Sequence, residues 1–274
     1  IQINRSTINS IIKPRIEETL EIIWQNIKLN NLHNKKIKNV VITGGGANDT
    51  IVIAISAEGN SDTVNGGAGS DTLQLSSGVH TLTTDNKLLN VETVKTHADG
   101  STVDLTNQTE SFNITVGAGT DSLKGGGAAD TINILNAGEG NSDTIDGGAG
   151  SDIIQLSTGS HALTTDNKLL NVETILAHAS GSSIDLTNQA EAFTITGGAA
   201  VDTLKGGSGA DIITGNGGND IITGGAGNDS LTGSAGDDTF NVDSGTDSIT
   251  DLGTGSDIFV VSSGATLNAA DISS

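Results

Sequence analysis

The sequence is poor in the residues that usually build a compact core. Its 274 residues include no Cys, Met or Tyr, a single Pro, and only 2% aromatic side chains. The absence of Cys excludes disulfides and thiolate metal sites. Ile, Val and Leu must therefore form the interior, and β-branched side chains pack well on pleated strands. We expect thin layers of short strands in place of a globular core.

Long apolar runs and targeting signals are also missing. No stretch approaches 18 apolar residues, so we expect no membrane-spanning helix. The N-terminus has no signal-peptide pattern and no initiator Met. We therefore expect this chain to be part of a longer product.

The common catalytic motifs are absent as well. The chain has no H-E-x-x-H zinc-protease motif and no G-x-S-x-G nucleophile elbow. It also has no G-x-x-x-x-G-K-[ST] loop, so its many glycines do not indicate nucleotide binding. We expect that the protein is not an enzyme.

Positive charge is scarce beyond position 41. The segment 1–41 carries seven Lys or Arg and three Glu, whereas the remainder carries five Lys against 30 Asp or Glu. The whole chain has a formal net charge of −21. An acidic surface of this kind repels nucleic acid and anionic lipid, and it attracts cations. We expect no nucleic-acid partner.

Glycine and aspartate recur with a period of nine near the C-terminus. The best units fit G-G-x-G-x-D-x-U-x, where U is a large apolar residue. A fixed short period predicts a solenoid, because each unit is too small to bury a core alone. The first six positions should form a turn and the last three a strand. The six aspartates of this series are Asp202, Asp211, Asp220, Asp229, Asp238 and Asp247.

The chemistry of the unit indicates calcium. If two nonapeptides form one coil, turns two units apart lie above one another and pair Asp202 with Asp220, Asp211 with Asp229, Asp220 with Asp238, and Asp229 with Asp247. About six hard oxygens with flexible geometry suit Ca²⁺ better than Mg²⁺. The alternative is that Gly and Asp only build turns. The candidate ligands are the six aspartates above, Asp71, Asp121, Asp130 and Asp152, and the backbone carbonyls of Gly206, Ser208, Gly215, Gly217, Gly224 and Ala226.

A longer repeat precedes the tandem units. The segment 44–124 aligns with 125–205 at an offset of 81, and LTTDNKLLNVET occurs in both copies. We divide the chain into a helix–strand fragment (1–43), two long repeats (44–124 and 125–205), a tandem nonapeptide roll (197–257) and a tail (258–274). The tail is a possible part of a secretion signal.

Other polar residues of the long repeats recur at the same phase. His80 matches His161, and His97 matches His178, which favours structural places on the coils over metal binding or catalysis. Glu92 and Glu173, within the NVET segments, are interpreted as surface or turn groups.

Six consecutive units at constant spacing resemble the RTX (repeats-in-toxin) family. The resemblance covers positions 44–274 loosely and 197–257 tightly. It implies an all-β, right-handed parallel β-roll filled with calcium. It also implies type I secretion, disorder in the calcium-poor cytosol, and folding outside the cell. The units at 233–241 and 242–250 depart from the motif, so their sites are expected to be weak.

Near the N-terminus, Pro14, Arg15, Glu17 and Glu18 precede a T-G-G-G-A stretch, Thr43–Ala47. On these residues, the segment 1–47 resembles a fragment of the bacterial cell-division protein FtsA, an actin-like family. Ile16, Leu20, Ile23 and Ile27 have helical spacing, and Val40–Thr43 read as a strand, so we expect a short α-helix and strand appended to the roll. The resemblance matches Gly44, Gly45 and Gly46 to an adenosine-binding motif, but the remaining parts of that fold are missing. A fusion, artificial or degenerate, is one interpretation of this end; an unrelated helical cap on the first coil is the other.

The function expected from these features is calcium binding by a secreted or cell-surface repeat protein with a structural or adhesive role. Its partners would be calcium ions and components of the cell surface or extracellular matrix. One alternative is the repeat region of an exported enzyme or toxin whose catalytic domain is missing. The other is an FtsA fragment fused to repeats, which would place the chain in the cytoplasm.

Overall fold

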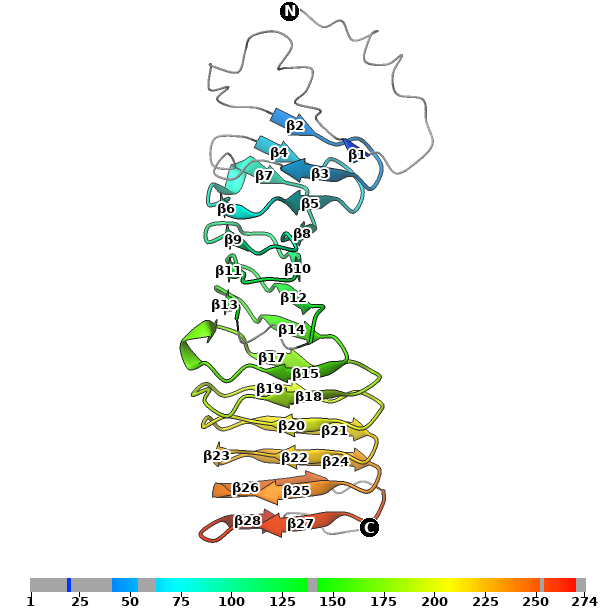
Figure 1. The fold of residues 1–274 in the computed structure, drawn as a ribbon, viewed down its shortest axis with the longest axis vertical. Helices are drawn as coiled ribbons and strands as arrows, with labels where there is room; N and C mark the ends of the chain where they lie inside the picture. Colours follow the sequence, from blue (N-terminus) through cyan, green and yellow to red (C-terminus); the bar gives the residue numbers. More distant parts are fainter. Residues whose placement is uncertain (1–18, 21–40, 54–62, 138–141, 252–253, 270–274) are drawn as a thin grey trace, which may run out of the picture.

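The chain folds as an all-β parallel solenoid (Figure 1). The computed structural model describes residues 19–20, 41–53, 63–137, 142–251 and 254–269. Coils of short strands stack along one axis, and every strand pairing among these residues is parallel. The predicted fold class is therefore confirmed for the described part of the chain.

One side of the solenoid is a continuous 14-stranded sheet. Its strands are β1 (Thr19–Leu20), β3 (Thr50–Ile53), β5 (Thr72–Leu75), β8 (Thr93–Lys95), β10 (Asn113–Val116), β12 (Thr131–Ile134), β14 (Ile153–Leu156), β17 (Thr174–Leu176), β19 (Thr194–Thr196), β21 (Ile212–Gly217), β24 (Ser230–Ala235), β26 (Ser244–Asp251), β23 (Ala226–Gly227) and β28 (Thr266–Ala269).

The other strands of each coil form three shorter sheets. The first contains β2 (Val41–Thr43), β4 (Thr63–Asn65) and β7 (Leu88–Leu89). The second contains β6 (Gly78–Thr81), β9 (Ser101–Asp104), β11 (Ser122–Lys124), β13 (Thr144–Asp146) and β16 (Leu169–Leu170). The third contains β15 (Gly159–Ala162), β18 (Ser182–Asp185), β20 (Thr203–Lys205), β22 (Ile221–Thr223), β25 (Thr239–Val242) and β27 (Ile258–Val261). Two 3₁₀ turns, η1 (Asp85–Lys87) and η2 (Asp166–Lys168), precede β7 and β16.

The long repeat of the sequence corresponds to four coils of unequal length. Thr50 pairs with Thr72, Thr72 with Thr93, Thr93 with Asn113, and Asn113 with Thr131. Hydrogen bonds between the turns of these coils join positions that are 22, 21, 20 and 18 apart in the sequence. The same series follows from Thr131 to Ile212. Beyond Ile212 the offset stays at 18, the predicted two nonapeptides per coil, as far as β26.

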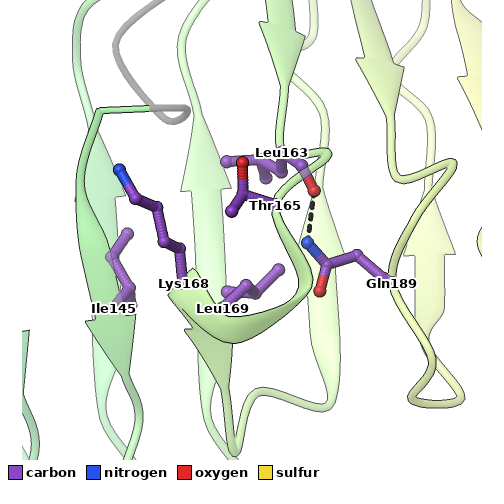
Figure 2. Close-up of a pocket in the computed structure, with 6 residues that line it drawn as sticks. All are labelled: Ile145, Leu163, Thr165, Lys168, Leu169 and Gln189. Carbon is purple, nitrogen blue, oxygen red and sulfur yellow. Dashed lines mark hydrogen bonds between the residues drawn. The ribbon is translucent and has the colours of Figure 1, made fainter.

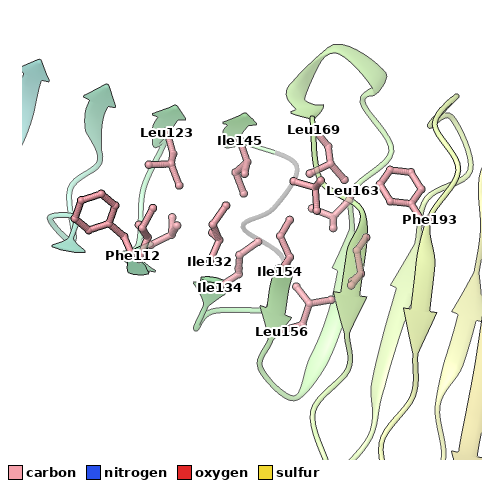
Figure 3. Packing of buried hydrophobic residues seen from close by; sticks show 14 of the residues in the cluster. Phe112, Leu123, Ile132, Ile134, Ile145, Ile154, Leu156, Leu163, Leu169 and Phe193 are labelled. Carbon is pink, nitrogen blue, oxygen red and sulfur yellow. The ribbon is translucent and has the colours of Figure 1, made fainter. Parts of the chain in front are cut away.

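The core is a row of aliphatic side chains, one per coil, facing a second row from the opposite sheets. Figure 3 shows this packing between positions 112 and 193. Strands alternate a buried residue with a less buried one, as in Ile213 (0% exposed) and Ile212 (52%). In the 14-stranded sheet the buried row is Ile51, Leu73, Val94, Ile114, Ile132, Ile154, Ile175, Ile195, Ile213, Leu231 and Ile249.

The N-terminal fragment differs from its prediction where the structure describes it. Most of the expected helix lies outside the described residues, but Thr19 and Leu20 form β1, which pairs with β3. The expected strand is present as β2, and it pairs in parallel with β4. β2 is therefore a rung of the solenoid and not an appendage, because the open edge of β4 offers it a ladder of backbone partners.

Candidate functional site: two columns of stacked acidic turns

The turn aspartates of successive coils lie above one another in two columns. Both columns contain pairs of aspartates in which the backbone N–H of one donates to the carboxylate of the other, one coil further on. The first column contains Asp49, Asp71, Asp130, Asp152, Asp211, Asp229 and Asp247. The second contains Asp121, Asp143, Asp202, Asp220, Asp238 and Asp257.

All four pairs predicted from the sequence are stacked in this way. The N···Oδ1 distance is 2.8 Å for Asp202 to Asp220, Asp211 to Asp229 and Asp220 to Asp238, and 3.1 Å for Asp229 to Asp247. The predicted residues of the long repeats join the same columns. Asp130 donates to Asp152 over 2.7 Å, Asp121 to Asp143 over 2.8 Å, and Asp49 to Asp71 over 2.7 Å.

Burial leaves many of these carboxylates only half satisfied. Each of the ten predicted aspartates is at most 1% exposed. A buried carboxylate is costly unless its oxygens have partners. Oδ1 accepts the N–H of the residue stacked on it, but in six of these aspartates Oδ2 has no hydrogen-bond partner in the described structure. The six are Asp71, Asp152, Asp220, Asp229, Asp238 and Asp247.

The first glycine of each turn keeps a space open beside the unpartnered oxygen. A methyl group on Gly215 would lie 2.4 Å from Asp220 Oδ2 and 2.9 Å from the carbonyl oxygen of Gly233, one coil further on. A methyl group on Gly224 would lie 2.2 Å from Asp229 Oδ2. At Gly215, oxygens from two coils thus converge where a side chain would otherwise be. Hard oxygens that lie close together in this way suit a calcium ion, which accepts oxygen ligands at flexible geometry.

The turns occur in two forms, which differ in the partner of Oδ2. In a capped turn the N–H of the second residue donates to Oδ2 of the same unit, as from Gly198 to Asp202 (2.7 Å) and from Gly207 to Asp211 (2.9 Å). In an open turn the second residue has a positive φ, and Oδ2 is left without a partner. The capped turns begin at Gly44, Gly125, Gly197 and Gly206. The open turns begin at Gly66, Gly147, Gly215, Gly224 and Gly233.

The fourth residue of the unit explains most of this difference. In every open turn it is a glycine with φ between +118° and +138°, a region that other residues rarely adopt. In three capped turns it is Ala47, Ala128 or Ala200, none of which has a positive φ. In the fourth capped turn position four is a glycine, Gly209, but it also lacks a positive φ. This turn stacks on the Gln189 segment of the preceding coil, which is not a glycine turn. Gly at position four is therefore necessary for an open turn but does not ensure one.

The predicted carbonyl ligands divide into two groups. The carbonyl oxygens of Gly215 and Gly224 face the first glycine of the preceding coil, 2.2 Å and 2.3 Å from a methyl group placed on Gly197 and Gly206. Gly206 is the equivalent first glycine of its own unit. Ser208, Gly217 and Ala226 occupy position three, where their N–H groups bond to Gln189, Gly198 and Gly207 of the preceding coil. Position one thus supplies the carbonyls that border the space beside Oδ2.

The electrostatics of the columns disfavour ionised carboxylates when no cation is bound. Burial, together with the neighbouring carboxylates of its column, raises the pKa of Asp220 to about 6 and that of Asp229 to about 7. Burial and the charges of Asp130, Glu173 and Asp146 raise the pKa of Asp152 to about 6. Burial also raises the pKa of Asp130, Asp211, Asp238 and Asp247. A divalent cation would reverse this penalty.

The columns contain acidic residues that the sequence reasoning did not select. Asp49 lies in a unit with Ala at position four, and Asp143 lies in a unit without the opening glycine pair. Asp257 extends the second column. Glu92 and Glu173 are exposed, as expected, but their carboxylates accept the N–H of Asp71 and Asp152 (both 2.7 Å). Each lies 21 positions beyond the aspartate whose N–H it accepts, a spacing that identifies it only once the coil length is known.

The repeated histidines and Gln189 form hydrogen bonds within the solenoid. His80 and His161 are fully buried, occupy the core row of their sheets, and bond through Nε2 to the carbonyls of Ser76 and Ser157 (2.9 Å). His97 and His178 accept the N–H of the residue two positions later. Gln189 donates to the carbonyl of Leu163 beside a cavity of about 10 Å³ (Figure 2), large enough for about one water molecule.

The described residues offer no metal site built from side chains alone. They include no group of three His, Cys, Asp or Glu side chains placed to hold a metal ion. A cation in the columns would therefore depend on backbone carbonyls for its remaining ligands. Gly44, matched above to an adenosine motif, lies instead against Asp49 Oδ2 and the carbonyl of Gly66 in the first column. No described helix is long and apolar enough to cross a membrane.

Comparison with known proteins identifies the repeat. The family described as RTX calcium-binding nonapeptide repeat (4 copies) matches residues 38–52, 55–78, 113–141, 133–160, 196–231 and 214–249, just over half of the chain. The matches leave out positions 79–112 and 161–195, which contain the NVET segments. A search of curated proteins finds no match.

Substituting the first glycine of an open turn tests the space beside Oδ2. Gly215→Ala places a methyl group 2.4 Å from Asp220 Oδ2. We expect it to remove at least one bound calcium, measured by isothermal titration calorimetry, and to cost about 1–3 kcal/mol of stability through overpacking. Gly46→Ala is the control, because a methyl group there has nothing within 4 Å. Equal calcium binding by the two variants would contradict the assignment.

The raised pKa values predict opposite pH dependences with and without calcium. A carboxyl whose folded pKa lies near 6–7, above its usual value of 3.8, stabilises the fold at low pH and loses this contribution as pH rises through 6–7. In excess chelator the melting temperature should be several degrees higher at pH 5 than at pH 8. His80 and His161, whose pKa is lowered by burial, oppose this trend.

In saturating calcium the order should reverse, because ion binding requires ionised carboxylates. Melting curves at the two pH values, in chelator and in calcium, provide the test. The same pH dependence in both conditions would show that the column carboxylates do not bind the ion.

Proposed function

Because this chain belongs to the RTX calcium-binding nonapeptide repeat family, we propose that it is a calcium-dependent structural module of a secreted or cell-surface protein. Calcium is its cofactor, as the family description states. The proposed role is structural or adhesive, and not enzymatic. The components that it would contact are those of a cell surface or extracellular matrix.

One observation carries the calcium assignment to particular residues. The open turns bury a carboxylate oxygen without a protein partner. In the open turns that begin at Gly215, Gly66 and Gly147, this oxygen lies next to a backbone carbonyl of the adjacent coil, from Gly233, Asn90 and Asn171 respectively. We assign the ions to the open turns, with Asp71, Asp152, Asp220, Asp229 and Asp238 as the carboxylates that need them most. The aspartates of the capped turns already have a backbone N–H on Oδ2. These aspartates would add a ligand to an ion held by the open turn of the neighbouring coil, and they would not hold an ion by themselves.

The size of the effect supports calcium-induced folding. Extracellular calcium modules bind at about 10⁻⁴–10⁻³ M. With an affinity of ~0.1 mM and ~2 mM calcium, each site stabilises the folded state by about 1.8 kcal/mol. Four or five such sites contribute on the order of 7–9 kcal/mol, comparable to the stability of a whole domain. At cytosolic calcium concentrations this contribution almost disappears.

The charge distribution supports folding outside the cell. Beyond position 41 the acidic residues outnumber the basic ones by 30 to five. Without cations, such a chain repels itself and resists compaction. A chain that stays extended in calcium-poor cytosol and folds in extracellular calcium suits export by type I secretion. The exported-enzyme alternative requires a catalytic domain in addition to the residues described here.

Calcium titration of the folding transition tests this proposal. The full chain should gain β-sheet circular dichroism as calcium rises into the millimolar range and lose it in excess chelator. Asp220→Ala should weaken two stacked sites together, since its carboxylate lies between the turns of Asp202, whose N–H it accepts, and of Asp238, to which the Asp220 N–H donates. Asp99→Ala removes the same charge from a side chain that is 82% exposed and should bind as the wild type does.

Two outcomes would count against the proposal. One is a β-sheet signal and melting temperature that are the same in chelator and in calcium. The other is equal calcium affinity for the two aspartate variants, which would place the ions outside the columns.

A further inference from the structure

We propose that each long repeat contains one hybrid calcium site, formed between a nonapeptide turn and the NVET segment of the next coil. The first hybrid site consists of Asp71, Glu92 and the carbonyl of Asn90. The second, its equivalent in the other long repeat, consists of Asp152, Glu173 and the carbonyl of Asn171. This inference rests on the proposed calcium function of the columns and extends it to segments outside the matched repeats.

The two glutamates occupy the place of an aspartate in the first column. The N–H of Asp71 donates to Glu92 Oε2, and the N–H of Asp152 to Glu173 Oε2, both over 2.7 Å. In the regular stacks this N–H donates to an aspartate Oδ1 of the next coil, as from Asp211 to Asp229. A second carboxylate therefore lies beside each aspartate and accepts the same N–H as in a pair of nonapeptides.

The asparagine carbonyls occupy the place of the first glycine carbonyl. A methyl group on Gly66 would lie 1.9 Å from the Asn90 oxygen and 2.5 Å from Asp71 Oδ2. On Gly147 it would lie 2.1 Å from the Asn171 oxygen and 2.6 Å from Asp152 Oδ2. The same space in a regular pair is bordered by an aspartate Oδ2 and a glycine carbonyl.

The backbone of the NVET segments adopts the conformation that this placement needs. Asn90 and Asn171 both have φ of +50°, in the left-handed region that Asn tolerates better than most residues. Their side-chain amides donate to Asn65 and Asp146, at the end of the strand below (2.8 and 2.6 Å). This bond ties each asparagine to the turn over which its carbonyl lies.

The buried half of each hybrid site lacks a partner in the same way as the regular open turns. Asp71 is 0% exposed and Asp152 is 1% exposed, and the Oδ2 atom of each has no hydrogen-bond partner among the described residues. Both aspartates belong to open turns, with positive φ at the second and fourth glycines. An aspartate Oδ2 and an asparagine carbonyl thus border one space, and the glutamate carboxylate is bonded to the backbone N–H of the same aspartate. A hard divalent cation matches this set of oxygens.

Glutamine substitution separates ion binding from hydrogen bonding. Glu92→Gln with Glu173→Gln removes two charges but keeps an oxygen that accepts the N–H of Asp71 and Asp152. If the glutamates serve only as caps, this variant binds as much calcium as the wild type. Because they are proposed as ligands, we expect the full chain to lose two calcium equivalents at saturation in equilibrium dialysis, and each single variant to lose one.

The matched control is Glu110→Gln with Glu191→Gln, a repeat-equivalent pair whose carboxylates accept backbone N–H groups of their own segments. It makes the same charge change away from the hybrid sites and should leave calcium binding unchanged. Equal stoichiometry and affinity in the two double variants would overturn the inference. Wild-type chain that binds no calcium would instead overturn the proposed function, so the two failures are distinguishable.

Circular dichroism in saturating calcium accompanies the dialysis. A double glutamine variant that keeps the wild-type β-sheet signal while losing two equivalents supports the hybrid sites. The hybrid sites would be contradicted if the double variant lost calcium only in proportion to its loss of β-sheet signal while each single variant still bound as many calcium equivalents as the wild type.

Discussion

The structure depends on carboxylates that are buried in columns with one oxygen left unpartnered. In the tandem nonapeptides each coil brings acidic turns directly above those of the preceding coil, and the N–H-to-carboxylate bonds fix that alignment. The thin aliphatic core gives the coils a common axis but has few aromatic side chains to supply volume. A cation between coils would turn the most unfavourable feature of this fold into a strong cross-link.

The two turn forms suggest how the columns are built up. Each of the four capped turns stands at the start of a run of stacked units, as at Gly197 before the open turns at Gly215 and Gly233. A capped turn satisfies its own carboxylate through the backbone, so it tolerates a preceding coil that has no glycine turn. Because a solenoid coil contacts only its neighbours, each ion would stabilise one interface and present an ordered turn to the next. The hybrid sites would carry this order across the long repeats.

Sequence reasoning predicted the fold class and the turn pairs, because two nonapeptides map directly onto one coil of the tandem roll. It did not predict that the long repeat is four coils of unequal length, since offsets of 20, 21 and 22 hide the register that a constant period reveals. Glu92 and Glu173 escaped selection for the same reason: they align with the column only once the coil lengths are known. Open and capped turns differ in the backbone conformation of the second residue. The sequence indicates this difference only in part, through Ala or Gly at position four.

The central claim is that calcium supplies the missing partner of the buried Oδ2 atoms. Anomalous diffraction from crystals grown in calcium tests it most directly, because calcium scatters anomalously and the surrounding atoms of this cysteine- and methionine-free chain do so only weakly. The account predicts peaks between coils, within bonding distance of Asp220, Asp229 and Asp238 Oδ2. Columns without such peaks, with these oxygens bonded only to protein or water, would contradict it.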